Sequence, residues 1–91
     1  MFVIISYDVS DNSRRNRLFK LLEGHGQPVQ RSVFECDLTP AEFRTLRGRV
    51  AKIVDAQADL VRFYRMCVEC TDRIDWIGGL PVTHDPDYYV V

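Results

Sequence analysis

Hydrophobic and polar positions divide this chain into short strands and two amphipathic helices. Residues 2–9 form an apolar run rich in β-branched and aromatic side chains and too short for a helix, which predicts a strand. Alternation puts Val3, Ile5, Tyr7 and Val9 on one face and Phe2, Ile4, Ser6 and Asp8 on the other. Both faces are largely apolar, so the pattern predicts a central strand covered on both sides, with Asp8 as the polar exception at its C-terminal end.

Two segments show helical spacing. The first helix is predicted from an N-cap at Asp11 or Asn12 to about Glu23, with Gly24 as a left-handed cap. The second begins at Thr39-Pro40-Ala41-Glu42, which combines an N-cap, a proline at the first helical position and a capping box, and it is predicted to continue to about Asp55. The predicted core stripes are Leu18, Leu21 and Leu22 in the first helix, and Phe43, Leu46, Val50, Ile53 and Val54 in the second.

The remaining segments favour β structure. Residues 27–37 form either one strand or two short strands broken near 30–32, and the pattern alone leaves this open. A strand is predicted over residues 59–70, and a short terminal strand over residues 87–91. Between them, a turn of helix packed on the body of the domain would fit Ile74, Trp76 and Ile77. With a hairpin in the middle, the order is the ferredoxin-like βαββαβ plan of an α+β protein, with an extra C-terminal strand. We therefore expect one ferredoxin-like domain over 1–78 and a tail over 79–91.

One sheet face has no cover in this plan. Both helices lie on the same side, and the face that carries Phe2 and Ile4 has no other segment of the chain to bury it. A second copy is the economical cover, so we expect a homodimer packed through its sheets, with the tail strand pairing with the edge of the partner's sheet.

Composition narrows the class of protein. The chain has 91 residues, 46% hydrophobic and 27% charged, which is typical of one soluble globular domain. Its N-terminal apolar run is too short for a signal peptide or a membrane span, and its three cysteines do not make a disulfide framework, so we expect a cytoplasmic protein without a membrane partner. The lone motif Cys67-Val68-Glu69-Cys70 lacks a second pair for zinc, and on a strand its cysteines would point to opposite faces, which favours a structural role.

Charge is distributed unevenly along the chain. Residues 1–54 carry nine Lys or Arg against six Asp or Glu, whereas residues 55–91 carry three against seven. Three arginines, Arg14, Arg15 and Arg17, fall at the start of the first helix, where each cation opposes the helix dipole at a cost of about 0.3–1 kcal/mol. Because the free N–H groups of a helix start attract phosphate, we favour anion binding here over a solvated basic face. For the second basic set, Arg44, Arg47, Arg49 and Lys52, a solvated face is favoured over contact with nucleic acid.

Several motifs together resemble the CRISPR-associated Cas-two family. They are Tyr7-Asp8-Val9, Arg15-Asn16-Arg17, the Gly24/Gly26 break and Gln30-Arg31-Ser32-Val33-Phe34-Glu35, and the resemblance covers nearly the whole chain. It implies a ferredoxin-like homodimer with metal-dependent endonuclease activity on RNA or DNA. It also implies a partnership with the Cas-one integrase, in which the dimer holds new spacer DNA before insertion into the CRISPR array.

The resemblance assigns roles to individual residues. Asp8 corresponds to the metal-binding and catalytic aspartate, and the two Asp8 side chains of a dimer would hold one Mg²⁺ between them. Some family members carry a basic residue shortly before the matched glutamine, where this chain has Gln27-Pro28-Val29, and Arg31 is the candidate substitute. The expected nucleic-acid-binding residues are Arg14, Arg15, Arg17 and Arg31. Tyr7, Ser32 and Phe34 are candidates for the border of the cleft, with core packing as the alternative for Tyr7 and Phe34.

Three functions compete at this point. The first is a scaffold that bridges integrase subunits and holds duplex DNA by its phosphates, and the second is a Mg²⁺-dependent endonuclease centred on the Asp8 pair. The third, which rests on the fold alone, is a toxin-type ribonuclease or a small regulatory binding domain without catalysis. The sequence does not choose between RNA and DNA.

Overall fold

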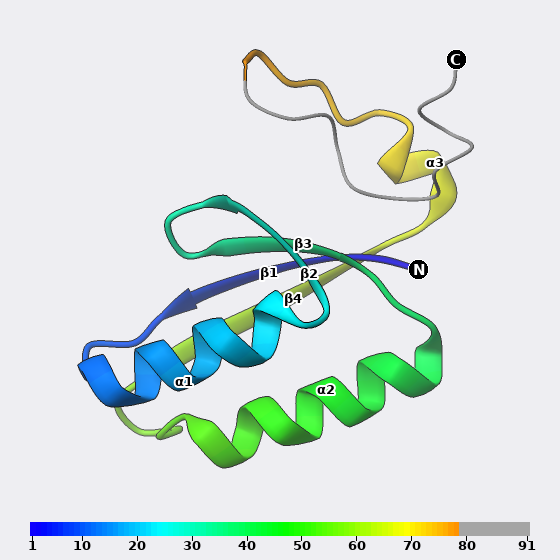
Figure 1. The fold of residues 1–91 in the computed structure, drawn as a ribbon. Coiled ribbons are helices and arrows are strands. Elements are labelled where there is room, and N and C mark those ends of the chain that lie inside the picture. The colour runs from blue at the N-terminus through cyan, green and yellow to red at the C-terminus, as the bar shows by residue number, and fades with distance from the viewer. Residues whose placement is uncertain (79–91) are drawn as a thin grey trace.

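The computed structural model describes residues 1–78, which form one antiparallel sheet with two long helices (Figure 1). The elements are β1 (Phe2–Asp8), α1 (Asn12–Glu23), β2 (Gly26–Gln30), β3 (Val33–Asp37), α2 (Pro40–Ile53), β4 (Leu60–Met66) and α3 (Val68–Thr71). The strand order is β2-β3-β1-β4, and every neighbouring pair is antiparallel. The predicted ferredoxin-like α+β plan is confirmed, while the predicted strand at 87–91 and the tail lie outside the described residues.

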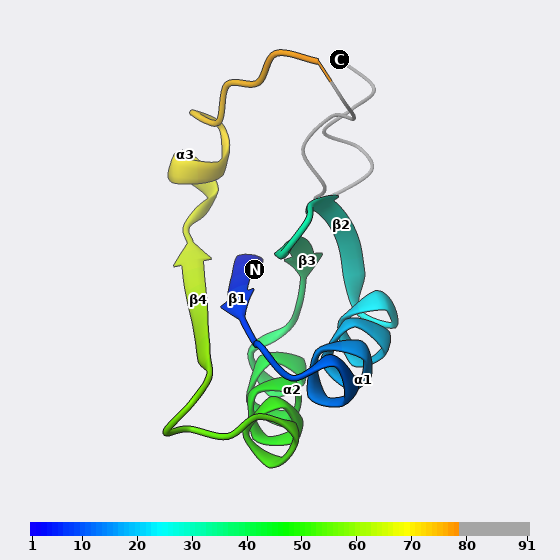
Figure 2. The ribbon, with the colours of Figure 1, turned by 90° about the vertical axis from the view of Figure 1, so that its left-hand side faces the viewer.

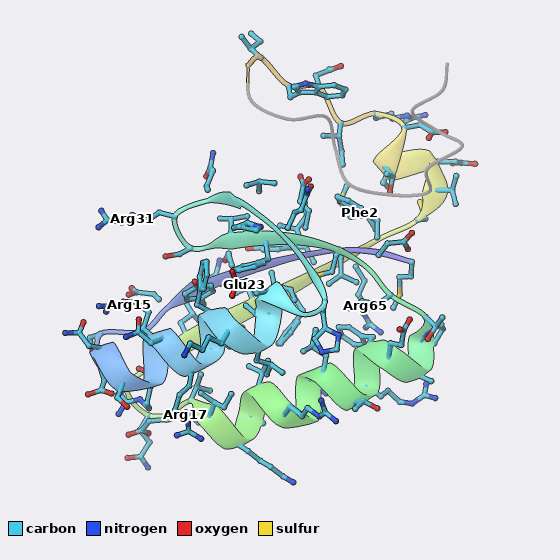
Figure 3. The ribbon with its side chains drawn as sticks, in the orientation of Figure 1. Phe2, Arg15, Arg17, Glu23, Arg31 and Arg65 are labelled. Carbon is cyan, nitrogen blue, oxygen red and sulfur yellow. The ribbon has the colours of Figure 1, made fainter. Side chains whose placement is uncertain are left out.

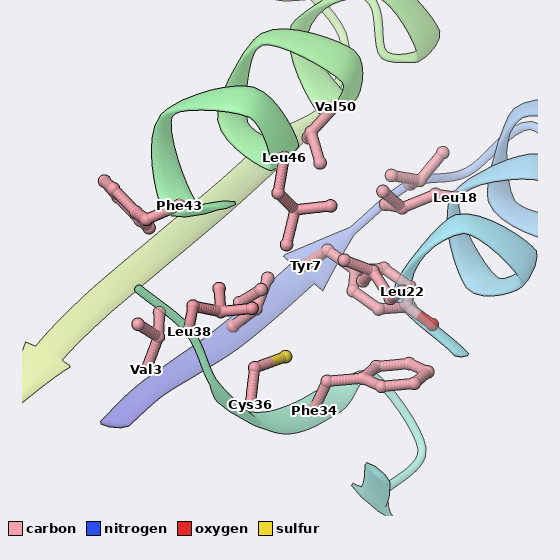
Figure 4. Packing of buried hydrophobic residues seen from close by; sticks show 12 residues of the cluster. Val3, Tyr7, Leu18, Leu22, Phe34, Cys36, Leu38, Phe43, Leu46 and Val50 are labelled. Carbon is pink, nitrogen blue, oxygen red and sulfur yellow. The ribbon is translucent and has the colours of Figure 1, made fainter. Parts of the chain in front are cut away.

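Both long helices cover the same face of the sheet. Figures 1 and 2 show α1 and α2 on one side, with α3 beyond the end of β4. The space between helices and sheet is filled by one apolar cluster (Figure 4), formed by Val3, Ile5, Tyr7, Val9, Leu18, Leu22, Phe34, Cys36, Leu38, Phe43, Leu46 and Val50. Val3, Ile5 and Tyr7 of β1 and the following Val9 belong to this cluster. The predicted alternation is therefore confirmed for the helix-covered face.

Local sequence signals explain where the helices begin. The carboxylate of Asp11 accepts a hydrogen bond from the Arg14 N–H at 2.9 Å, which makes Asp11 the N-cap of α1. Both bonds of the predicted capping box are present in α2, from the Glu42 N–H to the Thr39 hydroxyl at 3.1 Å and from the Thr39 N–H to the Glu42 carboxylate at 2.8 Å. The prediction of a left-handed cap was wrong, because Gly24 has a φ of −74° and continues the right-handed turn.

The middle segment is a hairpin of two strands, β2 and β3, joined by Arg31 and Ser32. Gly26 opens it, and here a glycine is needed. A Cβ at this position would lie 2.4 Å from both the Cys36 Sγ and the Glu35 carbonyl oxygen, far closer than such atoms approach. The close packing of β2 on β3 therefore depends on the missing side chain of Gly26.

The end of β4 differs from the prediction. The strand stops at Met66, and the next residues form α3, so the expected strand over 59–70 is four residues too long at its C-terminal end. The predicted helical turn at residues 74–77 is also wrong, because this segment is not helical and, of its apolar side chains, only Ile74 is partly buried. Trp76 is 52% exposed, and Ile77 is fully exposed.

The sheet face opposite the helices is open over much of its area. Strand register places the even-numbered residues of β1 beside those of β4 on this face. The open face, as we call it, comprises Phe2, Ile4, Ser6 and Asp8 of β1, Leu60, Arg62, Tyr64 and Met66 of β4, and Val33, Glu35 and Asp37 of β3. Phe2 is buried and points away from the helices (Figure 3), whereas Leu60 and Tyr64 are 50% and 47% exposed.

None of the helices within residues 1–78 is long and apolar enough to cross a membrane.

Candidate metal and nucleic-acid site

The acid singled out by the sequence, Asp8, lies exposed at the C-terminal end of β1, on the open face and opposite Leu60 of β4. The hairpin turn lies close to it, because the Tyr7 N–H donates a hydrogen bond to the Ser32 carbonyl at 3.0 Å. The end of β1, the start of β4, the start of α1 and the hairpin turn therefore meet at one end of the sheet. Asp8 offers its carboxylate to solvent at this meeting point.

Arg15 holds the loop that follows Asp8. One of its guanidinium nitrogens donates to the carbonyls of Val9 and Ser10 at 2.9 and 3.2 Å, and the other donates to the side-chain oxygen of Asn12. A planar guanidinium has several donors in a fixed geometry, so it can bind neighbouring carbonyl oxygens at the same time. Arg15 thus fixes the path of the chain from β1 into α1 and with it the position of Asp8.

Arg14 is held in an ion pair with Asp59, a residue that sequence reasoning missed. The Arg14 Nε and Nη2 donate to the two Asp59 carboxylate oxygens at 2.8 and 3.2 Å, so the pair is bidentate. The Asp59 side chain has no exposed surface, and it also accepts a hydrogen bond from the Asp55 N–H at 2.9 Å. These hydrogen bonds lower the pKa of Asp59, and the bond to Asp59 raises the pKa of Arg14. The pair fastens the start of α1 to the loop before β4.

The Asp59 ion pair gives the unfolding free energy a specific pH dependence. Because the pKa of folded Asp59 lies below its ordinary value of 3.8, the pair stabilises the fold above that pH, and its contribution is lost as the pH falls through the lowered pKa. We expect Asp59→Asn to be less stable than the parent at pH 7 and to approach it below about pH 4. Urea unfolding at a series of pH values measures this. Glu23→Gln, at the exposed end of α1, is the control, and a stability difference for Asp59→Asn that does not change with pH would contradict the assignment.

The other two arginines are free to meet a ligand. Arg17 and Arg31 are exposed, and neither makes a hydrogen bond or an ion pair with any residue of the described chain. Arg31 lies in the hairpin turn, and Figure 3 shows it with Arg15 at the end of the molecule where β1 ends. Of the four predicted nucleic-acid-binding residues, two are thus unpaired and two are engaged in holding the fold around Asp8.

Two of the predicted cleft residues lie in the core. Tyr7 and Phe34 are 7% and 0% exposed, and their rings stack with centroids 6.4 Å apart on the face opposite Asp8. Burial raises the pKa of the Tyr7 hydroxyl, and the charge of Arg15 opposes the shift. These positions favour the packing alternative for both residues. Ser32, half-buried in the turn beside β1, is the one predicted cleft residue at the Asp8 end.

The second basic set lies elsewhere. Arg44 and Arg47 of α2 line an open groove on the helix side of the molecule, together with Arg65 of β4. The Arg65 guanidinium lies over the Phe43 ring, 5.1 Å from its centroid. This groove is separate from the end of the sheet that carries Asp8.

Asp8 is the candidate metal ligand at this end of the sheet. Within residues 1–78, His, Cys, Asp and Glu side chains form no group of three or more that could hold a metal ion. Asp8 fits Mg²⁺ in kind, because this ion binds through one or two carboxylates and fills its other positions with water and phosphate oxygens. A second Asp8 carboxylate would come from a second copy of the chain.

Comparison with known proteins identifies the family. The model of the CRISPR associated protein Cas2 family matches residues 1–74. The protein named CRISPR-associated endoribonuclease Cas2 1 of Chloroflexus aurantiacus is 44% identical, and the alignment covers all of both chains.

Solved structures agree with this result. The crystal structure of Streptococcus pyogenes Cas2 at pH 6.5 has a TM-score of 0.75 and 37% identity, over 86% of this chain and 100% of that one. A chain of a partial Cas6-RT-Cas1–Cas2 complex has a TM-score of 0.76 and 30% identity, over 93% of both chains. The chain described here therefore belongs to the Cas2 family of CRISPR-associated proteins.

Proposed function

We propose that this chain acts in CRISPR adaptation as a homodimer that joins a Cas1 integrase and holds nucleic acid by its phosphate backbone. The observation that carries the proposal is the open face, which has exposed apolar side chains and ends in Asp8. The family match and the Cas1–Cas2 complex among the similar structures support the adaptation role and the Cas1 partner.

The open face has the character of an interface between identical copies. Leu60 and Tyr64 are about half exposed, and Ile4 beside Tyr64 and Val33 on β3 are half-buried. A domain of this size has a small core, and large exposed apolar side chains in a group are typical of association surfaces. Two such faces packed about a two-fold axis give each residue the same environment in both copies. With the axis near the end of β1, the two Asp8 carboxylates would face each other.

We propose that Mg²⁺ is held by this pair of Asp8 side chains. When bound, the ion polarises a phosphodiester and lowers the pKa of a coordinated water. The rest of the work belongs to the chain. Asp8 supplies the negative charge, Arg15 fixes the loop that orients it, and the unpaired Arg17 and Arg31 contact phosphates of the bound nucleic acid. The name of the Chloroflexus relative supports endoribonuclease activity as the reaction of this site.

The dimer is tested by replacing an exposed residue of the open face with a charged one. We expect the parent to sediment as a dimer at micromolar concentration and Tyr64→Glu to raise its dissociation constant by at least about tenfold, because the interface would have to bury a carboxylate from each copy. Thr45→Glu, an exposed position on the helix side, adds the same charge and should leave the dimer intact. A monomeric parent at micromolar concentration would refute the homodimer.

The phosphate contacts are tested by the salt dependence of binding to duplex DNA. In a dimer, the double variant Arg17→Ala/Arg31→Ala removes up to four phosphate contacts, so the slope of log K against log salt should become shallower by about 3–4. The double variant Arg44→Ala/Arg47→Ala loses the same charge on α2 and should change the slope by less than about one. Equal changes in slope from the two double variants would show that net charge governs binding, and that Arg17 and Arg31 make no specific phosphate contacts.

A further inference from the structure

The Cys67-Val68-Glu69-Cys70 motif brings two exposed thiols together. β4 ends at Met66, so Cys67 is the N-cap of α3 and Cys70 lies in its single turn. On a continued strand the two side chains would have pointed to opposite faces. The two sulfur atoms are 3.3 Å apart, and both side chains are open to solvent. Neither the proposed metal site nor the open face uses them, and no third ligand for a metal accompanies them in residues 1–78.

We propose that Cys67 and Cys70 form an oxidisable dithiol, which low-molecular-weight disulfides such as glutathione disulfide convert reversibly into an intramolecular disulfide. A disulfide needs its sulfur atoms about 2.05 Å apart, so they must approach by only about 1.3 Å, which rotation of the two exposed side chains can supply. This inference does not depend on the proposed function.

The hydrogen bonds between the two residues assign different roles to the thiols. The Cys70 N–H donates to the Cys67 Sγ at 3.4 Å, a contact that stabilises a thiolate on Cys67. The pKa of Cys67 is accordingly lowered by its bonds from Cys70, and the pKa of Cys70 is raised by the neighbouring Cys67. Cys67 is therefore the attacking thiol and Cys70 the resolving one.

The reaction runs in two exchange steps. The Cys67 thiolate, having given its proton to solvent, attacks one sulfur of glutathione disulfide, and the other half leaves as a thiolate that takes up a proton. The Cys70 thiol then loses its proton and attacks the Cys67 Sγ, which forms the Cys67–Cys70 bond and releases the second glutathione as a thiol. Two protein thiols are oxidised, and one glutathione disulfide is reduced to two thiols.

The site lies at a junction of the chain. Figure 2 shows α3 directly beyond the end of β4, and the register that pairs Asp8 with Leu60 puts this end of the strand far from the Asp8 end. In the reduced form, the turn is held by main-chain bonds and by the Thr71 hydroxyl, which donates to the Cys67 carbonyl at 3.0 Å. A disulfide would lock this turn, through which the sheet connects to the C-terminal residues.

To test the proposal, the full chain is incubated in glutathione buffers with an increasing ratio of disulfide to thiol. The reaction is quenched with acid, free thiols are alkylated, and the products are measured by mass spectrometry. We expect loss of two alkylatable thiols, without retained glutathione, and recovery of both on reduction. Cys36 is the internal control, because it is fully buried and its pKa is raised to about 11 by burial, so it should stay reduced. Glutathione on both surface cysteines without ring closure, or no reaction in excess oxidant, would overturn the proposal.

Two single variants test the assigned roles. Cys70→Ser should trap one glutathione on Cys67, because the Cys70 main-chain N–H that stabilises a thiolate at position 67 is retained in this variant. Cys67→Ser should trap glutathione on Cys70 more slowly, because the Cys70 thiol is not the acceptor of this bond. The residues are exposed, so both variants should fold, and near-parental circular dichroism checks this. Equal trapping rates would refute Cys67 as the attacking thiol.

Discussion

Asp8→Asn is expected to lower Mg²⁺-dependent hydrolysis of RNA or DNA by about a hundredfold or more. The substitution keeps the size of the side chain and removes the charge that would hold the ion. A metal that stabilises charge on a phosphodiester supplies several kcal/mol, and each 1.36 kcal/mol corresponds to a factor of ten in rate. The measurement is cleavage of RNA and duplex DNA over a Mg²⁺ titration, with parent and variant at the same protein concentration.

Asp11→Asn is the matched control for this variant. It removes the same charge three residues further on, and asparagine caps a helix as well as aspartate does, so α1 should keep its start. We expect its hydrolysis to stay within about threefold of the parent, since Asp11 belongs to no step of the proposed reaction. Unchanged hydrolysis in Asp8→Asn would refute the metal site. Lost hydrolysis with normal spacer acquisition in cells would assign the biological role to DNA holding and not to cleavage.

Local signals in the sequence were sufficient for the starts of the two long helices. Thr39 and Glu42 are three residues apart, so the capping box depends on the chain's own geometry and is present in the structure as predicted. The alternation over residues 2–9 likewise separated the core face of β1 from the face that carries Asp8. Patterns of this kind are read within a few residues and need no knowledge of the rest of the fold.

Contacts between distant residues were beyond the sequence. Arg14 and Asp59 are 45 positions apart, and nothing in either neighbourhood marks them as partners. Without that pair, the three arginines at the start of α1 looked equivalent. In the structure they are different, because Arg14 is paired, Arg15 holds the loop after Asp8, and Arg17 is unpaired among the described residues.

The end of β4 shows how a local error changes a functional reading. Residues 59–70 are rich in β-forming side chains, and the pattern contained no signal strong enough to stop the strand at Met66. On a strand, Cys67 and Cys70 would point apart and seem inert. One turn of helix puts their sulfur atoms 3.3 Å from each other and makes them a candidate for redox chemistry.

Phe34→Ala is expected to lower the free energy of unfolding by about 3–5 kcal/mol, because it leaves a large cavity in the core. Phe34 is fully buried in β3, beside Tyr7 (Figure 4). Its ring also makes an edge-to-face contact with Phe19, with the two centroids 5.2 Å apart. Total stabilities of small domains are about 5–15 kcal/mol, so this loss is a large share. Urea unfolding measures it, with all chains at one concentration because a dimer's stability depends on concentration.

The same variant separates packing from a role at the cleft. Phe34 points into the core on the face opposite Asp8, so folded Phe34→Ala should keep nucleic-acid binding and hydrolysis close to the parent values at low temperature. Phe19→Ala is the matched control, since it removes an aromatic partner of Phe34 that is itself 36% exposed, and it should cost about 1 kcal/mol. A Phe34→Ala protein of parental stability that binds nucleic acid poorly would show that this ring borders the cleft, whereas a large loss of stability with binding retained would assign it to the core.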